Sequence, residues 1–202
     1  MDKNAFLKWL KINTLFFVGA FIVGSLLAVL FPDHMLGFGR RWGASVIAIS
    51  RTISEPVSRK GFFVNIVIFN SFTTFIKSLL SLIFLGPLLS IAMGVFYSIG
   101  LISAFERGVT PLWHSPVLIF IEVLFSLLAM SYASALGSEI FGVLPGKKEI
   151  IDFWKENWKK AIPTQKKDWK AVFKENKKEL ILFIIMIFVL ILVGAWVEIL
   201  TI

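Results

Sequence analysis

Uncharged apolar runs about as long as a bilayer is thick recur along this chain, and they constrain its fold more than any other feature. Two of the clearest are residues 12–31 and 180–197, which contain no charged side chain. About 20 apolar residues in an α-helix cross the hydrocarbon core. Of 202 residues, 57% are hydrophobic and 17% are charged, and the mean hydropathy is +0.82. A soluble fold would leave too much of this surface in water, so we predict an all-α integral membrane protein.

The apolar runs divide the chain into five predicted transmembrane helices within a single membrane domain. They cover residues 12–31, 62–85, 87–105, 116–137 and 180–200. Gly86 and Pro87 are the only helix-breaking residues between the second and third runs, which predicts a tight turn there. Residues 35–61 combine arginines with apolar residues at helical spacing, which predicts an amphipathic helix that is interfacial or partly inserted.

Residues 138–179 form a lysine-rich segment with eleven lysines. Apolar residues at helical spacing on either side of Pro163 predict two basic amphipathic helices, the second continuing into the last span. Tryptophans suit the lipid headgroup region, and lysines are attracted to anionic lipid. We therefore predict that this insertion lies on an anionic cytoplasmic membrane surface, with a purely solvated face as the alternative. The residues expected there are Trp154, Trp158, Lys159, Lys160, Lys166, Lys167, Trp169 and Lys170.

The basic residues also predict an orientation in the cell membrane of a prokaryote. With the amino terminus inside and the carboxy terminus outside, fourteen lysines lie on the cytoplasmic side and six basic residues lie outside. The excess of basic residues in the loops favours that side as the cytoplasmic one. The positive charge therefore indicates lipid partners and not nucleic acid.

Several polar residues lie within or beside the predicted spans, where they are costly unless they face protein or water. They are Asn65, Asn70, Lys77, His114, Glu122, Glu139 and Glu198. If the helices cross the bilayer at similar angles, Glu122 lies near the depth of Asn70 but about 13 Å from that of Lys77. We predict a hydrogen bond from Glu122 to Asn70 or to the backbone near it, with Lys77 reaching toward the inner surface or toward Glu139.

Three of the spans carry small residues at intervals of four, which allow helix backbones to approach closely in lipid. These are Ala20, Gly24 and Ala28 in the first span, Ser90, Gly94 and Ser98 in the third, and Ala129, Ala133 and Gly137 in the fourth. The last span has only Gly194 and Ala195, which predicts a peripheral helix that faces lipid.

Common catalytic patterns are missing from the sequence. There is no cysteine, and the two histidines, His34 and His114, are far apart. The four aspartates lie outside the predicted spans, and neither H-E-x-x-H nor G-x-S-x-G occurs. We therefore predict no enzymatic activity, no metal site and no cofactor.

One stretch resembles a known family. It comprises residues 66–71 (Ile-Val-Ile-Phe-Asn-Ser), then Gly86-Pro87, Gly94, Gly100, a short link with His114, and residues 116–137 with Glu122. Over residues 60–140 this arrangement is similar to the stage II sporulation protein M family. The resemblance implies a polytopic membrane protein without known catalytic residues. The namesake is a membrane scaffold for peptidoglycan-remodelling enzymes, and its relatives suggest a wider role in membrane organisation or transport.

Two hypotheses about function follow. The first is a non-catalytic scaffold or assembly protein that organises partners in the membrane. The second is a small transporter or channel that acts as a homo-oligomer, because five helices provide few self-contained pathways. Buried polar groups bonded to one another favour the scaffold, whereas a wet path reaching both faces favours transport.

Overall fold

The computed structural model describes residues 2–34, 37, 59–107 and 114–200, and within these residues every regular element is an α-helix. The predicted amphipathic helix over 35–61 lies almost wholly outside the described residues. The helices are α1 (Lys3–Leu30), α3 (Arg59–Leu82), α4 (Gly86–Arg107), α5 (His114–Phe141), α6 (Lys147–Asn157), α7 (Trp169–Glu175) and α8 (Lys177–Leu200). The prediction of an all-helical fold is confirmed.

Four of the helices are long and apolar enough to cross a bilayer. The candidate spans are Lys3–Leu30, Phe63–Leu82, Pro116–Phe141 and Lys177–Leu200. The apolar part of α4, Gly86–Ile102, is shorter, so length and hydropathy give one candidate fewer than the five predicted. Several helices extend beyond the apolar runs. For example, α1 begins at Lys3 because the Asp2 side chain accepts a hydrogen bond from the Asn4 amide and caps its first turn.

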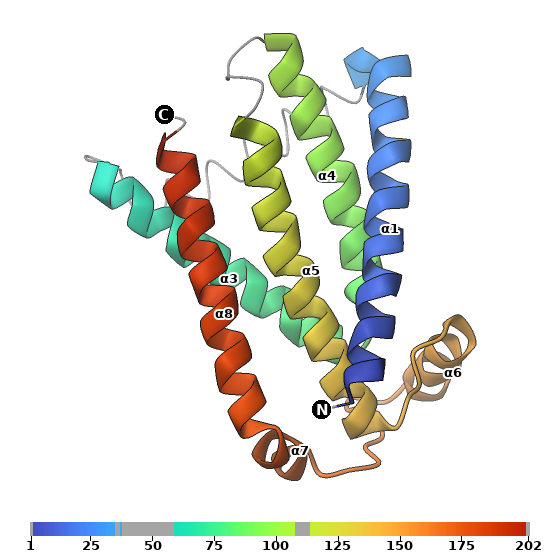
Figure 1. Cartoon of the computed structure of the whole chain (residues 1–202). Coiled ribbons are helices and arrows are strands. Elements are labelled where there is room, and N and C mark those ends of the chain that lie inside the picture. Colours follow the sequence, from blue (N-terminus) through green and yellow to red (C-terminus); the bar gives the residue numbers. More distant parts are fainter. Residues whose placement is uncertain (1, 35–36, 38–58, 108–113, 201–202) are drawn as a thin grey trace.

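The long helices run between two ends of the bundle, as Figure 1 shows. The amino terminus lies at the same end as α6 and α7, which we call the lysine end, and the carboxy terminus lies at the other. Helix α5 is central, with α1 and α4 on one side and α8 on the other, while α3 crosses them obliquely. Most side chains of α5 from Val123 to Phe141 are buried, whereas α8 exposes many large apolar side chains, as predicted for a peripheral helix.

The turn between α3 and α4 falls where Gly86 and Pro87 predicted it. The backbone of Phe84, and not that of Gly86, has a positive φ (65°) in this turn. Residues other than glycine rarely adopt this conformation. The Phe84 ring is 2% exposed, stacks on Trp9 of α1 at 5.3 Å and meets Phe153 of α6 edge-on at 4.9 Å. Burial of this ring offsets the cost of its backbone conformation.

One boundary in the lysine-rich segment differs from the prediction. The last span was expected to continue from the second amphipathic helix, but α7 ends at Glu175 and α8 begins at Lys177. Asn176 stands between them, and its side-chain amide donates to the carbonyl of Val172 and to Glu139 Oε2. These hydrogen bonds stabilise a break that hydrophobic periodicity does not reveal.

Candidate functional site

A line of polar side chains on α3 faces the central helix α5. The residues are Asn70, Thr74, Lys77 and Ser81, whose spacing of four, three and four places them on one helix face. Opposite them, α5 carries Glu122, Ser126 and Ser134. Lys77 Nζ donates to Ser126 Oγ at 3.2 Å, and Ser134 Oγ donates to the Ser81 carbonyl at 3.0 Å. The contact between α3 and α5 is therefore polar along much of its length.

Glu122 is the centre of what we call the outer cluster, which comprises Asn70, Lys77, Tyr97, Glu122, Ser126 and Glu198. Tyr97 of α4 donates its hydroxyl hydrogen to Glu122 Oε2 at 2.9 Å, and Asn70 makes a side-chain hydrogen bond to the same carboxyl group. The predicted contact between Glu122 and Asn70 is present. Glu198 of α8 lies within electrostatic range of Glu122 and Tyr97. Four helices thus contribute to one polar group.

Lys77 does not take either of the two positions predicted for it. Lys77 remains in the bundle and donates to Ser126, which lies one helical turn after Glu122 on α5. It also interacts electrostatically with Glu122. The prediction assumed helices crossing at similar angles, whereas α3 runs obliquely across the others (Figure 1) and the hydrogen bond to Ser126 holds Lys77 within one helical turn of Glu122. Glu139, the predicted partner of Lys77, lies 13 residues beyond Ser126 on α5, about 20 Å along the helix axis. Lys77 is bonded to Ser126 and therefore cannot reach Glu139.

Glu139 belongs to the lysine end of the bundle and not to the outer cluster. It accepts hydrogen bonds from the Asp2 amide at 3.1 Å and from Asn176 at 3.0 Å, so it connects the start of α1 to the junction of α7 and α8. Asn65 lies partly buried on α3, five residues before Asn70. His114 begins α5, but its side chain lies outside the described part of the structure.

The predicted small residues of α1 and α4 lie in the contact between these two helices. A Cβ added at Gly94 would lie 2.5 Å from the Phe17 carbonyl oxygen and 2.9 Å from Ala20 Cβ, and one added at Gly24 would collide with Ser98 Oγ. Ala28, Ser90 and Ser98 are each 0% exposed. On α5, Ala129 and Ala133 are buried, and a Cβ at Gly137 would collide with the Leu82 carbonyl oxygen.

The lysine-rich segment is docked onto the bundle by contacts at both of its halves. Phe153 of α6 is 6% exposed and packs in the same core as Trp9 and Phe84. The amides of Lys166 and Lys167 both donate to the Ile140 carbonyl, at 2.9 and 3.0 Å, and so cap the end of α5. The segment is therefore a folded part of the bundle, which we call the lysine platform (residues 138–179).

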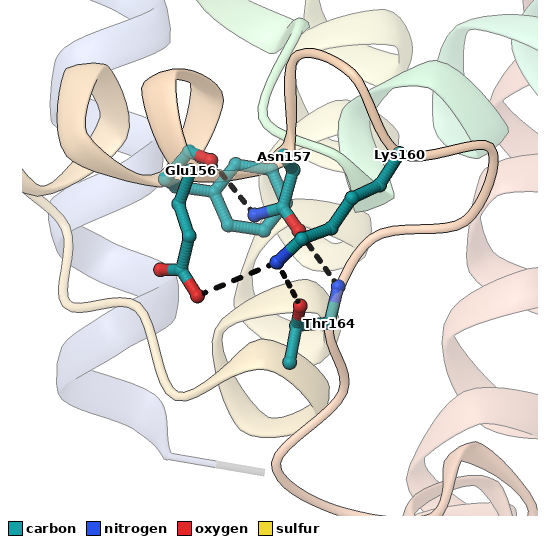
Figure 2. Close-up of polar contacts among 5 residues, drawn as sticks. Glu156, Asn157, Lys160 and Thr164 are labelled. Carbon is teal, nitrogen blue, oxygen red and sulfur yellow. Dashed lines mark hydrogen bonds and ion pairs between the residues drawn. The ribbon is translucent and has the colours of Figure 1, made fainter.

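The connection between the two halves of the lysine platform is held by Asn157 and Lys160, as Figure 2 shows. Asn157 donates to the Phe153 carbonyl and accepts from the Thr164 amide, both at 2.8 Å. Lys160 Nζ donates to Thr164 Oγ1 at 2.8 Å and lies 3.7 Å from Glu156 Oε1. Lys160 is thus partly engaged within the platform.

The predicted surface tryptophans divide into two kinds. Trp158 and Trp169 are 77% and 47% exposed, and the lysines predicted with them are exposed. Trp154 is partly buried and packs against the core beside Phe153, so less of its ring is available at the surface. The helix of residues 147–157 turns Phe153 and Trp154 toward the bundle, which leaves Trp158 to the outside.

Sequence reasoning missed Tyr97 and the role of Phe153. Tyr97 is one of only two tyrosines in the chain and stands in an otherwise apolar span, a signal that could have identified it. Among the residues that the structure describes, no three His, Asp or Glu side chains gather where they could hold a metal ion. Comparison with protein families, curated proteins and solved structures found no match to this chain.

Proposed function

We propose that this protein is a non-catalytic membrane scaffold that organises partners at one face of a cell membrane. The proposal takes the chain across the bilayer five times, with α4 as the fifth crossing and the lysine end in the cytoplasm. Helix α4 runs beside α1 between the two ends of the bundle (Figure 1), which supports that topology. The excess of lysines at the lysine end supports the orientation.

The observation that carries the proposal is the docking of the lysine platform. Its backbone caps α5 through Lys166 and Lys167, and its Phe153 enters the core. A segment that served only as a connection between spans would not need these contacts. Fixed contacts reduce the entropy lost when a surface binds a partner, so a docked platform suits recognition.

The outward face of the lysine platform combines apolar and basic side chains. Trp158, Ile162 and Trp169 are exposed among the lysines. Apolar side chains of this kind enter the headgroup region, and each nearby lysine adds about 1 kcal/mol on an anionic surface. Anionic lipid is therefore the first proposed partner of this face, followed by other membrane proteins or a second copy of the chain.

The lipid contact can be tested with spin labels on single cysteines, because the chain has none of its own. A label at Trp158→Cys should become shielded from a water-soluble quencher in bilayers containing anionic lipid. A label at Gln165→Cys serves as a matched site within the same exposed segment. Equal shielding of position 158 in neutral and anionic bilayers would remove the electrostatic part of the proposal. If an impermeant reagent labels Gln165→Cys from outside intact cells, the lysine end lies outside and the proposed orientation is wrong.

The scaffold itself is tested by purification in mild detergent with identification of the proteins that co-purify. Replacement of Lys159 and Lys167 by glutamine changes the platform charge without removing a side-chain contact of Lys160. The bound proteins should be reduced in this variant while the bundle remains folded. An unchanged set of bound proteins would show that their binding does not depend on the platform charge and would contradict the proposal.

Transport by a homo-oligomer is the second candidate function, because the outer cluster holds ionisable side chains inside spans even though they are bonded to one another. Lys77 and Glu122 are ionisable side chains inside spans, where such residues commonly mark ion or proton pathways. Glu122→Gln distinguishes the two functions. An amide can still accept the hydrogen bond from Tyr97, so a scaffold should keep its partners. An amide cannot exchange a proton, so a transporter should lose its activity.

A further inference from the structure

The net positive charge of the lysine platform lies in one short stretch, residues 158–167. This stretch contains four lysines and no acidic residue, whereas the rest of the platform contains seven lysines and seven acidic residues. The charges of the rest of the platform therefore balance. Each lysine near an anionic membrane surface contributes about 1 kcal/mol of attraction, so residues 158–167 are the part that such a surface attracts most.

The same stretch exposes two large apolar side chains. Trp158 is 77% exposed, more than any other large apolar side chain in the described part of the chain, and Ile162 is 72% exposed. Both lie in the connection between α6 and α7, within residues 158–163, which we call the anchor loop. Apolar side chains flanked by lysines suit the boundary between lipid headgroups and acyl chains.

The anchor loop is closed by Asn157, the last residue of α6. Its side chain is 5% exposed, donates to the Phe153 carbonyl and accepts from the Thr164 amide, so it joins the two ends of the loop (Figure 2). The Lys160 amide donates to the Asn157 carbonyl at 2.9 Å and adds a turn within the loop. The backbone of the loop is therefore held while its two apolar side chains stay exposed.

Contacts on both sides also hold the anchor loop relative to the spans. Phe153, one turn before Asn157, is buried in the core, and the amides of Lys166 and Lys167 cap the end of α5. Figure 1 shows α6 displaced sideways from the long helices at the lysine end. Beside the spans of a membrane protein, this level is occupied by lipid headgroups. The loop that follows α6 is therefore in a position to meet lipid.

We propose that the anchor loop inserts Trp158 and Ile162 into an anionic membrane surface beside the spans, and that Asn157 positions the loop for insertion. A loop that is already closed loses less conformational entropy when it binds than an open one does. The lysines of residues 158–167 would then lie near the lipid phosphates, which are the groups that attract them.

This inference rests on the proposed function, because it names the part of the lysine platform that enters the lipid. The two can fail separately. Trp169 is exposed on the platform but lies outside the anchor loop. A spin label at Trp169→Cys therefore reports contact between lipid and the rest of the platform.

The experiment measures the depth of spin labels on single cysteines in the full-length protein, held in nanodiscs that contain anionic lipid. Both faces of a nanodisc are open to a water-soluble quencher, so the direction of insertion does not affect the result. The label at Ile162→Cys should lie about 5–10 Å into the boundary between headgroups and acyl chains. The label at Gln165→Cys should remain accessible to the quencher.

Asn157→Ala tests the positioning role, because it opens the loop without changing any charge. The label at position 162 should then lose its depth and become as accessible to the quencher as the label at position 165. Thr164→Val is the matched control, since it removes the acceptor of Lys160 Nζ but keeps the amide that donates to Asn157. The label at position 162 should keep its depth in this variant.

Asn157→Ser replaces Asn157→Ala if the latter does not fold, because serine keeps a hydroxyl group near the Phe153 carbonyl but is too short to take both bonds of asparagine. It should also reduce the depth of the label at position 162.

A label at position 162 that stays in water in the native background overturns the proposal. If the label at position 169 is shielded in the same nanodiscs, the platform still contacts lipid and only the anchor loop is wrong. If neither label is shielded, the proposed lipid contact fails as well. An unchanged depth in both Asn157 variants, or an equal loss in Thr164→Val, overturns the positioning role of Asn157.

Discussion

The contact between α1 and α4 and the contact between α3 and α5 hold helices together in different ways. Gly94 brings α4 against the backbone of α1 at Phe17, and no charged side chain is needed there. Between α3 and α5, Lys77 bonds to Ser126 and Ser134 bonds to the Ser81 carbonyl. The first contact depends on shape and the second on hydrogen bonds.

The difference matters because lipid supplies no hydrophobic force between helices. Close backbone approach gains van der Waals contact over a whole interface, and one added methyl group can separate the two helices. Interhelical hydrogen bonds are worth about 0.6 kcal/mol each on average, because the separated helices find other partners. The α1–α4 contact should therefore be sensitive to single substitutions, whereas the α3–α5 contact should tolerate them and remain available for binding or exchange.

The largest effect is expected for Gly94→Ala. The new Cβ would lie 2.5 Å from the Phe17 carbonyl oxygen, so α1 and α4 must move apart, at a cost of about 1–3 kcal/mol in the free energy of unfolding. Gly100→Ala is the control on the same helix, because nothing lies within 4 Å of its Cβ position. Unfolding in mixed micelles measures both, and equal effects would show that close approach is not what holds α4.

A smaller effect is expected for Tyr97→Phe, which removes the hydroxyl hydrogen donated to Glu122. The loss should be between about 0.6 and 1.7 kcal/mol, the mean and the largest value measured for hydrogen bonds between membrane helices. Adding Glu122→Leu to this variant tests the pair, because each single substitution removes the same hydrogen bond and the double-mutant cycle then measures the coupling. A loss as large as that of Gly94→Ala would contradict the distinction between the two kinds of contact.

The smallest effect is expected for the bond between Lys77 and Ser126. Ser126→Ala removes one neutral acceptor, and its coupling to Lys77→Met in a double-mutant cycle should be about 0.6 kcal/mol. Thr74→Val, on the same face of α3, removes a hydroxyl oxygen that has no partner among the described residues and should cost nothing. A coupling energy above that of Tyr97 and Glu122 would make Lys77 the main link between α3 and α5.

Much of the fold followed from local patterns. Uncharged runs of helical length predicted the long helices, because their backbone and apolar side chains leave few other stable structures in lipid. Gly86 and Pro87 predicted the turn, and Gly24 and Gly94 predicted a close helix contact. The interaction of Glu122 with Asn70 was also predictable, since it required only similar depths.

The residue partners outside those patterns were not predictable in the same way. Tyr97 is one of two tyrosines in the chain, but only the position of α4 directs its hydroxyl group to Glu122. Asn13 of α1 donates a hydrogen bond to Ser131 of α5, and these residues are 118 positions apart in the chain. No periodicity relates such residues, because their spacing in sequence carries no information about helix neighbours.

The amino-acid sequence by itself determined that this protein is helical and apolar, that its lysines gather in one segment, and that small residues line several spans. These properties are local, since they depend on side-chain chemistry and on spacing within one helix. The tertiary structure decided the partner of Lys77, the docking of the lysine platform and the hydrogen bond between Asn13 and Ser131. Each of these depends on the angle and order of helices, above all the oblique course of α3, and that angle is set by packing among residues distant in the chain.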